Sequence, residues 1–431
     1  MNRQTIFGQA VFAILRKSKR EATPPTSQRT VASHLLLPQR THDMKVIRYD
    51  IDPLFDGYDI VAGESYLCDE TILNDFNPNN TNIPIIESDN PKLKSFDPAD
   101  DWNEKKILVV RHGGFGDLIF LTPIFREIKK RWNRVSISVC CGKKYSEALS
   151  TNKDIDNIIA YPIKANEITA FHAVIHFVYS NEKEKRNQEI HIVDLFAETI
   201  NLQPIEDKTI SLYIPDNIIE DAKQNFPRTN FKRIGIQVYA ANSIRSYPFF
   251  QMKKLISLLI EKGFEIFLFG SENQINYSTQ KQIINLTTQK ITPTFLESAA
   301  TMTTCDLFIA PDSSLCHVAG ALKIPTVALY GSFPSKQRTK FASSIKAIDA
   351  TGSCAPCFHH TFGGVKFPRN QPCESSGYCN VLATIEPEKK KSSAIARKVS
   401  STVTQIFILI SKMFKKQKNT MNVVAIVESI V

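Results

Sequence analysis

Hydrophobic residues between positions 105 and 330 occur as short unbroken runs that alternate with helical stripes. Unbroken apolar runs of four or five residues are typical of strands that a parallel sheet buries on both faces. Apolar residues recur at the spacing of a helix in four segments: from Leu118 onward, and in Phe249–Glu261, Phe295–Thr303 and Leu315–Leu322. This alternation predicts an α/β protein with doubly wound parallel sheets. The predicted strands are Ile107–Val110, Val135–Cys140, Ala173–Phe177, Ile234–Val238, Glu265–Phe269, Leu307–Ala310 and Thr326–Tyr330.

The predicted strands fall into two sets, separated by a polar segment at Asp216–Thr229. We therefore expect two Rossmann-like halves facing a cleft. An N-terminal extension would precede them, with short strands near Val46 and Tyr58 and an Asn/Pro/Asp-rich linker from residue 76. The expected parts are a basic leader, disordered or amphipathic (1–43), the extension and linker (44–103), two Rossmann-like domains (104–225 and 226–350), a Cys-rich module (351–388) and a basic amphipathic tail (389–431).

Lysine and arginine are concentrated at the two ends of the chain. Residues 1–42 contain seven of them and one acidic residue, and residues 389–431 contain nine and one. Since the ends hold more than the whole net charge of +10, the part between them is acidic overall. A nucleic-acid-binding core would need clustered basic residues on the folded part, so the sequence argues against that partner.

Both ends also have the spacing of amphipathic helices, at Ile6–Leu15 and Ile395–Met413. Such basic helices bind anionic membrane surfaces, although either could instead pack on the protein. No apolar run has the length of a membrane-spanning helix, and no signal peptide is evident. Nine cysteines without regular pairing favour a reducing compartment. We expect a cytoplasmic protein, with peripheral attachment to the inner face of the membrane as an open alternative.

Two polar turns follow predicted strands and begin predicted helices. The first, His112-Gly-Gly-Phe-Gly-Asp117, matches neither the dinucleotide fingerprint nor a phosphate loop. Asp117 either caps the helix or acts chemically at the edge of the sheet. The second is Asp312-Ser-Ser-Leu-Cys-His317, where the helix N-terminus suits a phosphate and Ser313 and Ser314 add hydroxyl groups. Capping is again the alternative.

A third element, Ser243-Ile-Arg-Ser-Tyr-Pro248, follows the first strand of the second half. Arg245 could pair with a diphosphate, or it could be a solvated loop residue. In this order, the three elements resemble glycosyltransferase family 9, the ADP-heptose:lipopolysaccharide heptosyltransferases. The resemblance covers about residues 105–340 and rests on Gly113-Gly-Phe-Gly-Asp117 with Thr122-Pro123, on Arg245 before Tyr247-Pro248, and on Asp312-Ser-Ser-Leu-Cys-His317.

The resemblance implies the GT-B fold and an inverting transfer of a sugar, most simply heptose, from a nucleotide-diphosphate donor. It implies that Asp117 is the general base, and that no cofactor is needed because a fixed cation and a helix dipole hold the leaving group. The 104–225 domain would bind the acceptor and the 226–350 domain the donor. Ser314 replaces the family's usual Gly, Arg245 a frequent Lys, and Tyr247 a Trp. The implied donor-binding residues are Gly116, Arg245, Asp312, Ser313, Ser314 and His317.

Three functions follow from this resemblance. The first is transfer from ADP-heptose to a surface glycan or lipopolysaccharide-type acceptor. The second is heptosyl transfer to a protein hydroxyl, as in the autotransporter heptosyltransferases. The third is a catalytically silent protein that binds sugar nucleotides. The acceptor, the exact sugar and nucleotide, and the oligomeric state are left open.

The Cys-rich module contains Cys354, Cys357, Cys373 and Cys379 in a Gly/Pro/His-rich stretch. A Cys-x-x-Cys pair followed by further cysteines suits structural zinc or a rubredoxin-like iron site, while a disulfide pair and free thiols are the alternatives. The first two spacings also resemble the iron-binding cysteine finger of the autotransporter heptosyltransferases, although the last spacing looks shorter. Any metal here would organise structure and take no part in the sugar chemistry.

Overall fold

The computed structural model describes residues 44–48, 65–69, 85–88, 94–177, 190–271, 282–287, 294–358 and 372–385. All of these residues belong to one compact unit, Pro38–Val431. The two predicted amphipathic helices and the strand expected near Tyr58 lie outside the described residues. Among the described residues, no helix has the length and apolar character needed to cross a membrane.

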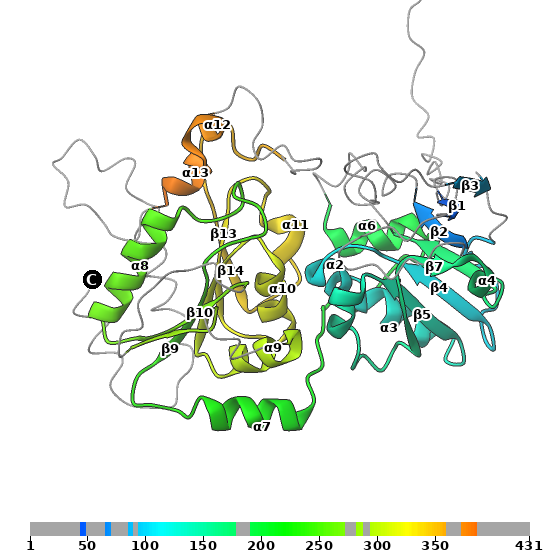
Figure 1. Ribbon diagram of the computed structural model, residues 1–431, viewed down its shortest axis with the longest axis horizontal. Coiled ribbons are helices and arrows are strands. Elements are labelled where there is room, and N and C mark those ends of the chain that lie inside the picture. Colours follow the sequence, from blue (N-terminus) through cyan, green and yellow to red (C-terminus); the bar gives the residue numbers. More distant parts are fainter. Residues whose placement is uncertain are drawn as a thin grey trace, which may run out of the picture. The chain divides into compact units, whose positions relative to one another are not determined.

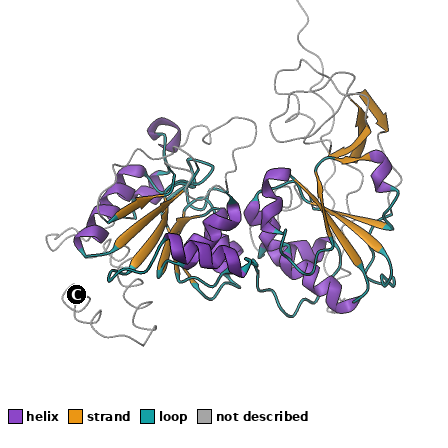
Figure 2. Cartoon of the chain, turned by 60° about the horizontal axis from the view of Figure 1, so that its bottom comes forward, coloured by secondary structure: helices purple, strands orange, loops and turns teal. Residues whose placement is uncertain are grey.

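The first half of the fold is built on a four-stranded parallel sheet in the order β6-β5-β4-β8, of which β5 and β4 are labelled in Figure 1. The central strand β4 is apolar and its last four residues are fully buried, as the sequence predicts. Figure 2 shows helices beside this sheet. The elements are β4 (Lys106–Val110), α2 (Phe115–Phe120), α3 (Thr122–Arg131), β5 (Ser136–Cys141), the 3-10 helix η2 (Lys143–Ala148), β6 (Asn157–Ala160), α4 (Ala165–Ile168), β8 (Ala173–His176) and α6 (Ile192–Thr199).

The helical stripe after β4 is two helices, whereas the sequence predicts one. Leu121 ends α2 and is also the residue before α3, which carries Pro123 in its first turn. Proline has no N–H with which to continue the hydrogen-bond ladder of a preceding helix, but it suits a first turn. The Thr122 hydroxyl donates to the Ile119 carbonyl oxygen at 2.8 Å and stabilises the junction.

The N-terminal extension forms a sheet with a strand of the first half. Strands β1 (Met44–Arg48), β2 (Ser65–Asp69) and β3 (Ile85–Ser88) pair antiparallel in the order β3-β1-β2, and β2 pairs with β7 (Ile163–Lys164). The expectation of a plain linker from residue 76 is therefore wrong at β3.

Residues 94–103 also differ from that expectation, because they pack on the first half. Phe96 and Trp102 are buried and stack at 5.0 Å, and the Phe96 ring meets the Trp132 ring edge-on at 5.7 Å. Burying large aromatic side chains is strongly favourable, which explains why this polar stretch is ordered.

The second half is built on a six-stranded parallel sheet in the order β11-β10-β9-β12-β13-β14. Numbered along the chain, this is the 3-2-1-4-5-6 order of a dinucleotide-type Rossmann domain, with its topological switch point between β9 and β12. The elements are α7 (Asp216–Asn225), β9 (Arg233–Gln237), α8 (Phe249–Glu261), β10 (Glu265–Phe269), β11 (Ile283–Asn285), α9 (Phe295–Thr303), β12 (Leu307–Pro311), α10 (Ser314–Ala321), β13 (Thr326–Tyr330), α11 (Lys336–Thr339) and β14 (Ile345–Asp349). Helix α7 packs against α9, although its residues lie before the boundary that we predicted at 225/226.

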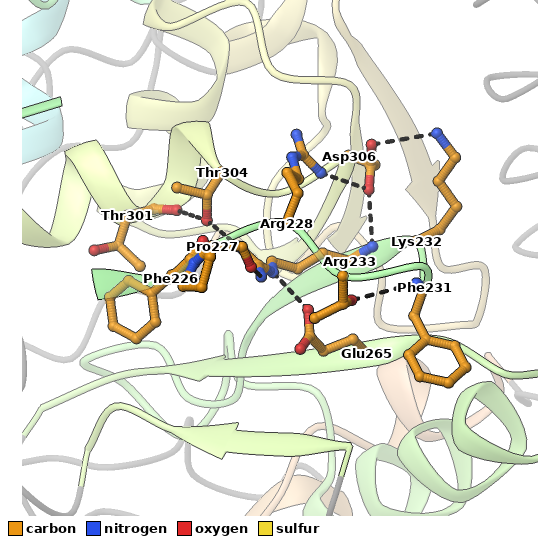
Figure 3. Close-up of polar contacts among 11 residues, drawn as sticks. Phe226, Pro227, Arg228, Phe231, Lys232, Arg233, Glu265, Thr301, Thr304 and Asp306 are labelled. Atoms are coloured by element: carbon orange, nitrogen blue, oxygen red, sulfur yellow. Dashed lines mark hydrogen bonds and ion pairs between the residues drawn. The ribbon is translucent and has the colours of Figure 1, made fainter. Parts of the chain in front are cut away.

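A buried arginine holds the segment before β9 against the second half (Figure 3). Arg233 is 2% exposed, and its guanidinium pairs with Glu265 at 2.7 Å. The same guanidinium donates to the Phe226 and Pro227 carbonyl oxygens at 3.1 and 2.9 Å and to the Thr304 hydroxyl at 2.9 Å. Arg233 lies at the start of β9, so this network is at the edge of the sheet opposite the predicted site.

The described part of the Cys-rich module packs on the second half. This part includes two short helices, α12 (Pro372–Ser376) and α13 (Asn380–Ala383). The Tyr247 hydroxyl donates to the Ile385 carbonyl oxygen, and the Gln251 amide donates to the Ala383 carbonyl oxygen at 2.8 Å. Tyr247, which takes the place of the family's Trp, therefore joins α13 to the loop that carries Arg245.

Candidate active site

The first predicted turn lies at the carboxyl end of β4, beside β8. Arg111 follows β4 directly and is 2% exposed. Its Nη1 donates to the Phe177 carbonyl oxygen after β8 at 2.6 Å, and its Nη2 lies 3.2 Å from Asp117 Oδ1. Arg111 was not predicted as a site residue, because the motif begins with glycines that follow it. The only sequence signal is an arginine directly after a buried strand.

Asp117 is the third residue of α2, with its side chain 31% exposed. Its Oδ2 accepts from the Gly114 N–H at 3.1 Å, so the carboxylate does help to cap the helix. Burial raises the pKa of Asp117, but the charges of Arg111 and Arg338 and the Gly114 hydrogen bond together lower it more. The net pKa lies below the usual range, and Asp117 is a carboxylate at neutral pH.

Two glycines of this turn are required by close contacts. A Cβ at Gly113 would lie 2.6 Å from Asp117 Oδ2 and 3.0 Å from Arg111 Nε, so only glycine leaves room for the ion pair. A Cβ at Gly116 would lie 2.8 Å from His317 Cδ2. Gly116 therefore allows α2 of the first half to approach α10 of the second half.

The second predicted turn lies at the carboxyl end of β12, next to β9. Asp312 and Ser313 are buried. No side chain caps the N-terminus of α10, because the Ser313 hydroxyl instead donates to the Gln237 side chain at the end of β9. The capping alternative is therefore wrong for Ser313. The two strands joined by this contact flank the topological switch point, where doubly wound domains bind their ligands.

His317 is buried against residues from both halves. Its Nε2 lies 3.8 Å from Asp312 Oδ1, and its ring centroid lies 4.6 Å from that of Phe120 in α2. Burial lowers the pKa of His317 to about 4, against the opposing influence of the Asp312 carboxylate. His317 is therefore a neutral imidazole at pH 7, and its buried Nδ1 has no hydrogen-bond partner among the residues that the structure describes.

Arg245 lies in a loop that is fixed by its own hydrogen bonds. The Ser246 hydroxyl accepts from the Ala240 N–H at 3.0 Å and donates to the Asn242 carbonyl oxygen at 3.0 Å. Arg245 itself is half-buried, and within the described part of the chain its Nε has no hydrogen-bond partner. The charge of Arg245 also contributes to the low pKa of His317, which places it near the second turn.

A second cation, Arg338 of α11, lies near this site. It is 7% exposed, its guanidinium lies 5.6 Å from the Phe333 ring centroid, and it lowers the pKa values of both Asp117 and His317. The structure thus brings Asp117, Arg245, Asp312 and His317 into one neighbourhood, as the motifs predict, and adds Arg111 and Arg338. Nothing in the sequence around Arg338 indicates a site.

Residues flanking the site also link the two halves. The Phe115 and Phe295 rings stack at 4.0 Å with an interplanar angle of 3°. The Glu147 carboxylate accepts from the Leu296 N–H at 3.1 Å. Tyr145, at which the Phe115 ring points edge-on, belongs to the same group.

The four cysteines of the predicted metal site share one hydrophobic cluster. Cys373 and Cys379 are buried in it, Cys354 and Cys357 pack against it, and none of them forms a disulfide. Burial, followed by the neighbouring thiols Cys357 and Cys354, raises the pKa of Cys373. Among the described residues, no group of three or more His, Cys, Asp or Glu side chains is arranged to hold a metal ion. The zinc or iron site stays a prediction.

Residues 169–363 match the model of glycosyltransferase family 9 (heptosyltransferase). The matched segment, called the family 9 domain below, covers 195 of the 431 residues. The resemblance read from the motifs is thus confirmed, although the matched residues of the family 9 domain include the Arg245 and Asp312–His317 motifs and not Asp117.

Two curated relatives are similar to the family 9 domain in sequence. Lipooligosaccharide heptosyltransferase 2 of Haemophilus ducreyi is 38% identical over 161 residues, which are 34% of this chain and 41% of the relative. Lipopolysaccharide heptosyltransferase 1 of Campylobacter coli is 30% identical over 167 residues, 37% of this chain and 44% of the relative. The chain therefore spans less than half the length of these two relatives.

Solved structures share the fold at low identity. A family 9 glycosyltransferase from Veillonella parvula has a TM-score of 0.56 and 15% identity, covering 74% of this chain and 100% of its own. The iron-containing dodecameric glycosyltransferase TibC from enterotoxigenic E. coli has a TM-score of 0.50 and 14% identity, covering 88% of this chain and 93% of its own. The predicted α/β fold of the GT-B type, with two parallel sheets, is confirmed.

Proposed function

We propose that this protein is an inverting heptosyltransferase that moves the sugar of a nucleotide-diphosphate donor, ADP-heptose, to a saccharide acceptor of lipopolysaccharide type. The observation that carries the proposal is the Asp117 carboxylate, which is ion-paired with Arg111 at 3.2 Å on helix α2, where the neighbouring Gly116 lies against His317 of the second half. A carboxylate on one parallel sheet and cations on the other are the two groups that such a displacement requires. The heptosyltransferase names of the sequence relatives support the choice of sugar.

In the proposed reaction, Asp117 accepts the proton of the acceptor hydroxyl while that oxygen attacks the anomeric carbon of the donor. The bond from the anomeric carbon to the diphosphate breaks, and the diphosphate leaves with the electron pair. Arg111 keeps Asp117 ionised and correctly oriented, through the ion pair at 3.2 Å. General-base assistance of this kind contributes about 10²–10⁴-fold to the rate.

The donor diphosphate would lie at the switch point of the second sheet. Arg245 and the uncapped N-terminus of α10 supply positive charge there, and the Ser313 side chain, with Gln237, fixes the turn. The Asp312 carboxylate is buried with an unpartnered Oδ1, which suits a hydroxyl of the donor sugar or ribose. The pocket would be shaped by neutral His317 and by the small residues Gly116 and Ser314. The positive charge that offsets the diphosphate would then come from protein groups and not from a metal ion.

The first test is isothermal titration of the purified protein with ADP, UDP and GDP in chelator-treated buffer. We expect a preference for ADP that is lost in Arg245→Ala and kept in Arg228→Ala, an exposed arginine at the opposite edge of the sheet. Transfer assays with ADP-heptose then compare the wild type with Asp117→Asn, which should bind donor normally and transfer about 10²–10⁴-fold more slowly. If no nucleotide binds, the proposal fails. If Asp117→Asn transfers normally, Asp117 is not the base.

A protein hydroxyl is the second candidate acceptor, because the cysteine spacing resembles that of the autotransporter heptosyltransferases. The structure of the iron-containing TibC also matches 88% of this chain, whereas the Veillonella protein matches 74%. Offering lipopolysaccharide-core saccharides and serine-containing polypeptides in parallel distinguishes the two acceptors, since only one should accept labelled heptose in an Asp117-dependent manner.

A further inference from the structure

The segment from the end of β13 through α11 contains two buried polar atoms that have no hydrogen-bond partner among the described residues. Ser332 is 2% exposed and its Oγ has no hydrogen-bond partner. Arg338, at 7% exposure, has an unpartnered Nη1. Buried donors are almost always paired in native proteins, and leaving one unpaired costs about 1–3 kcal/mol. Two such groups in this short segment indicate a site that binds a polar ligand.

The position of this loop in the sheet relates it to the proposed donor site. Strand β12 pairs with β9 on one side and with β13 on the other. The carboxyl ends of these three strands each lead to an unpartnered buried atom: Arg245 Nε after β9, Asp312 Oδ1 after β12, and Ser332 Oγ after β13. A ligand that lies across the end of β12 can therefore meet Arg245 on one side and the β13 loop on the other.

The two arginines are placed for different phosphates. The helix that carries Arg338 lies near α2 and therefore near Asp117, because Phe120 of α2 and Phe341, three residues after Arg338, both pack on the His191 ring, at 5.9 and 4.4 Å. The charge of Arg338 accordingly lowers the pKa of Asp117, whose carboxylate must lie next to the acceptor oxygen. In a displacement at the anomeric carbon, the sugar-bearing phosphate is the one nearer the base, because the anomeric carbon joins the two reacting oxygens. The Phe333 ring at 5.6 Å supports the guanidinium and limits its rotation.

We propose that Arg338, assisted by Ser332, binds the sugar-bearing phosphate of the donor and stabilises the charge that develops on it as the bond to the sugar breaks. Arg245 then holds the nucleoside-side phosphate. This assignment rests on the proposed function, since it presupposes a nucleotide-diphosphate donor. In this assignment each of the two phosphates of the leaving group is bound by a different arginine, which the motifs alone do not indicate.

The test compares ADP with AMP, which lacks the phosphate that Arg338 is proposed to bind. Titrations would use the wild type, Arg338→Met, which keeps a side chain to pack on Phe333, and Lys336→Met, which removes one exposed positive charge from the same helix. We expect Arg338→Met to weaken ADP about 10- to 100-fold, as for a lost hydrogen bond to a charged group, and to change AMP affinity less than about twofold. Lys336→Met should leave both affinities unchanged.

Equal losses for ADP and AMP would overturn the assignment, because they would indicate a structural role. Unchanged ADP affinity in Arg338→Met would also overturn the assignment. A raised KM for the acceptor in that variant would then indicate that Arg338 binds an acidic group of the acceptor. In both cases the wild-type protein still binds ADP, whereas failure of the wild type to bind any nucleotide refutes the proposed function itself. Should Arg338→Met not fold, as judged by thermal unfolding, Ser332→Ala must show a smaller loss confined to ADP.

Discussion

Replacing Arg111 with methionine should shift the acid limb of the pH–rate profile to higher pH. The guanidinium lies 3.2 Å from the Asp117 carboxylate, and Arg111 is 2% exposed while Asp117 is 31% exposed. In the wild type, burial raises the pKa of Asp117, and Arg111 is the foremost of the groups that reverse this effect. Methionine keeps most of the side-chain volume and removes the charge.

The size of the shift follows from the geometry. Because one partner is buried and the other is partly hydrated, an effective dielectric constant of about 40 is reasonable, between ~20 near a protein surface and ~80 in water. Two unit charges 3.2 Å apart then attract by about 2–3 kcal/mol, or about two pKa units. This agrees with the roughly 1–3 units by which a neighbouring cation usually lowers an aspartate pKa.

The direction of the shift is fixed by the protonation state that the reaction needs. A general base must be deprotonated, so kcat/KM falls as the pH drops through the pKa of Asp117 in the free enzyme. In the wild type that pKa is below the usual range. In Arg111→Met, burial is opposed only by Arg338 and Gly114, and the acid limb should rise by about two pH units.

The assay is the pH dependence of kcat/KM for heptosyl transfer. Arg126→Met is the matched control, since Arg126 pairs with Asp207 at 2.8 Å in the same half but with a half-exposed partner. Arg111→Lys should keep most of the low pKa, because it keeps the charge. Acid limbs that coincide for the wild type and Arg111→Met would refute the claim that this ion pair sets the pKa of the base.

Three further predictions test the turn, the fold and the module. In kinetic assays, Gly113→Ala should slow transfer roughly 100-fold, because its Cβ would displace the Asp117 carboxylate. Gly114→Ala should keep the transfer rate within about twofold of the wild type, because its Cβ would meet no atom within 4 Å. Equal effects of the two substitutions would contradict the steric argument. Arg233→Met should lower the free energy of unfolding by about 3–5 kcal/mol in denaturation experiments and Arg228→Met by at most about 1 kcal/mol, and similar losses would show that burial of the Arg233 network is unimportant. Elemental analysis should find about one zinc or iron ion per chain and much less in Cys373→Ser, whereas metal-free wild-type protein would rule out the site.

The sequence predicts the bounds of strands and helices closely where the local hydrophobic pattern determines the element. Helices α8 and α9 have the predicted bounds, and β4, β9 and β12 agree within one residue. Strands β6 and β14 were not predicted, because neither has an unbroken apolar run of four or five residues; no residue of β6 is fully buried, and Lys346 and Asp349 of β14 are exposed. The break between α2 and α3 depends on Pro123 and could have been read from the sequence.

The candidate site divides in the same way. Asp117, Arg245 and Asp312 could be predicted, because each follows a recognisable buried strand and the carboxyl ends of parallel strands share one edge. Arg111 stands next to the predicted motif, yet its role depends on two contacts, one of them to Phe177 after β8. Arg338 lies in the other half of the chain from Asp117, and no local pattern marks it.

The sequence by itself thus determined the alternation of strands and helices, the division into two halves, and the polar turns at the strand ends. These properties arise from apolar burial and turn chemistry among residues close in the chain. Only the tertiary structure decided that β2 of the extension pairs with β7, that Arg111 holds Asp117, and that Arg338 approaches the same site. Contacts of this kind depend on how distant segments pack, and buried charges and unpaired donors acquire their meaning only from the neighbours that packing supplies.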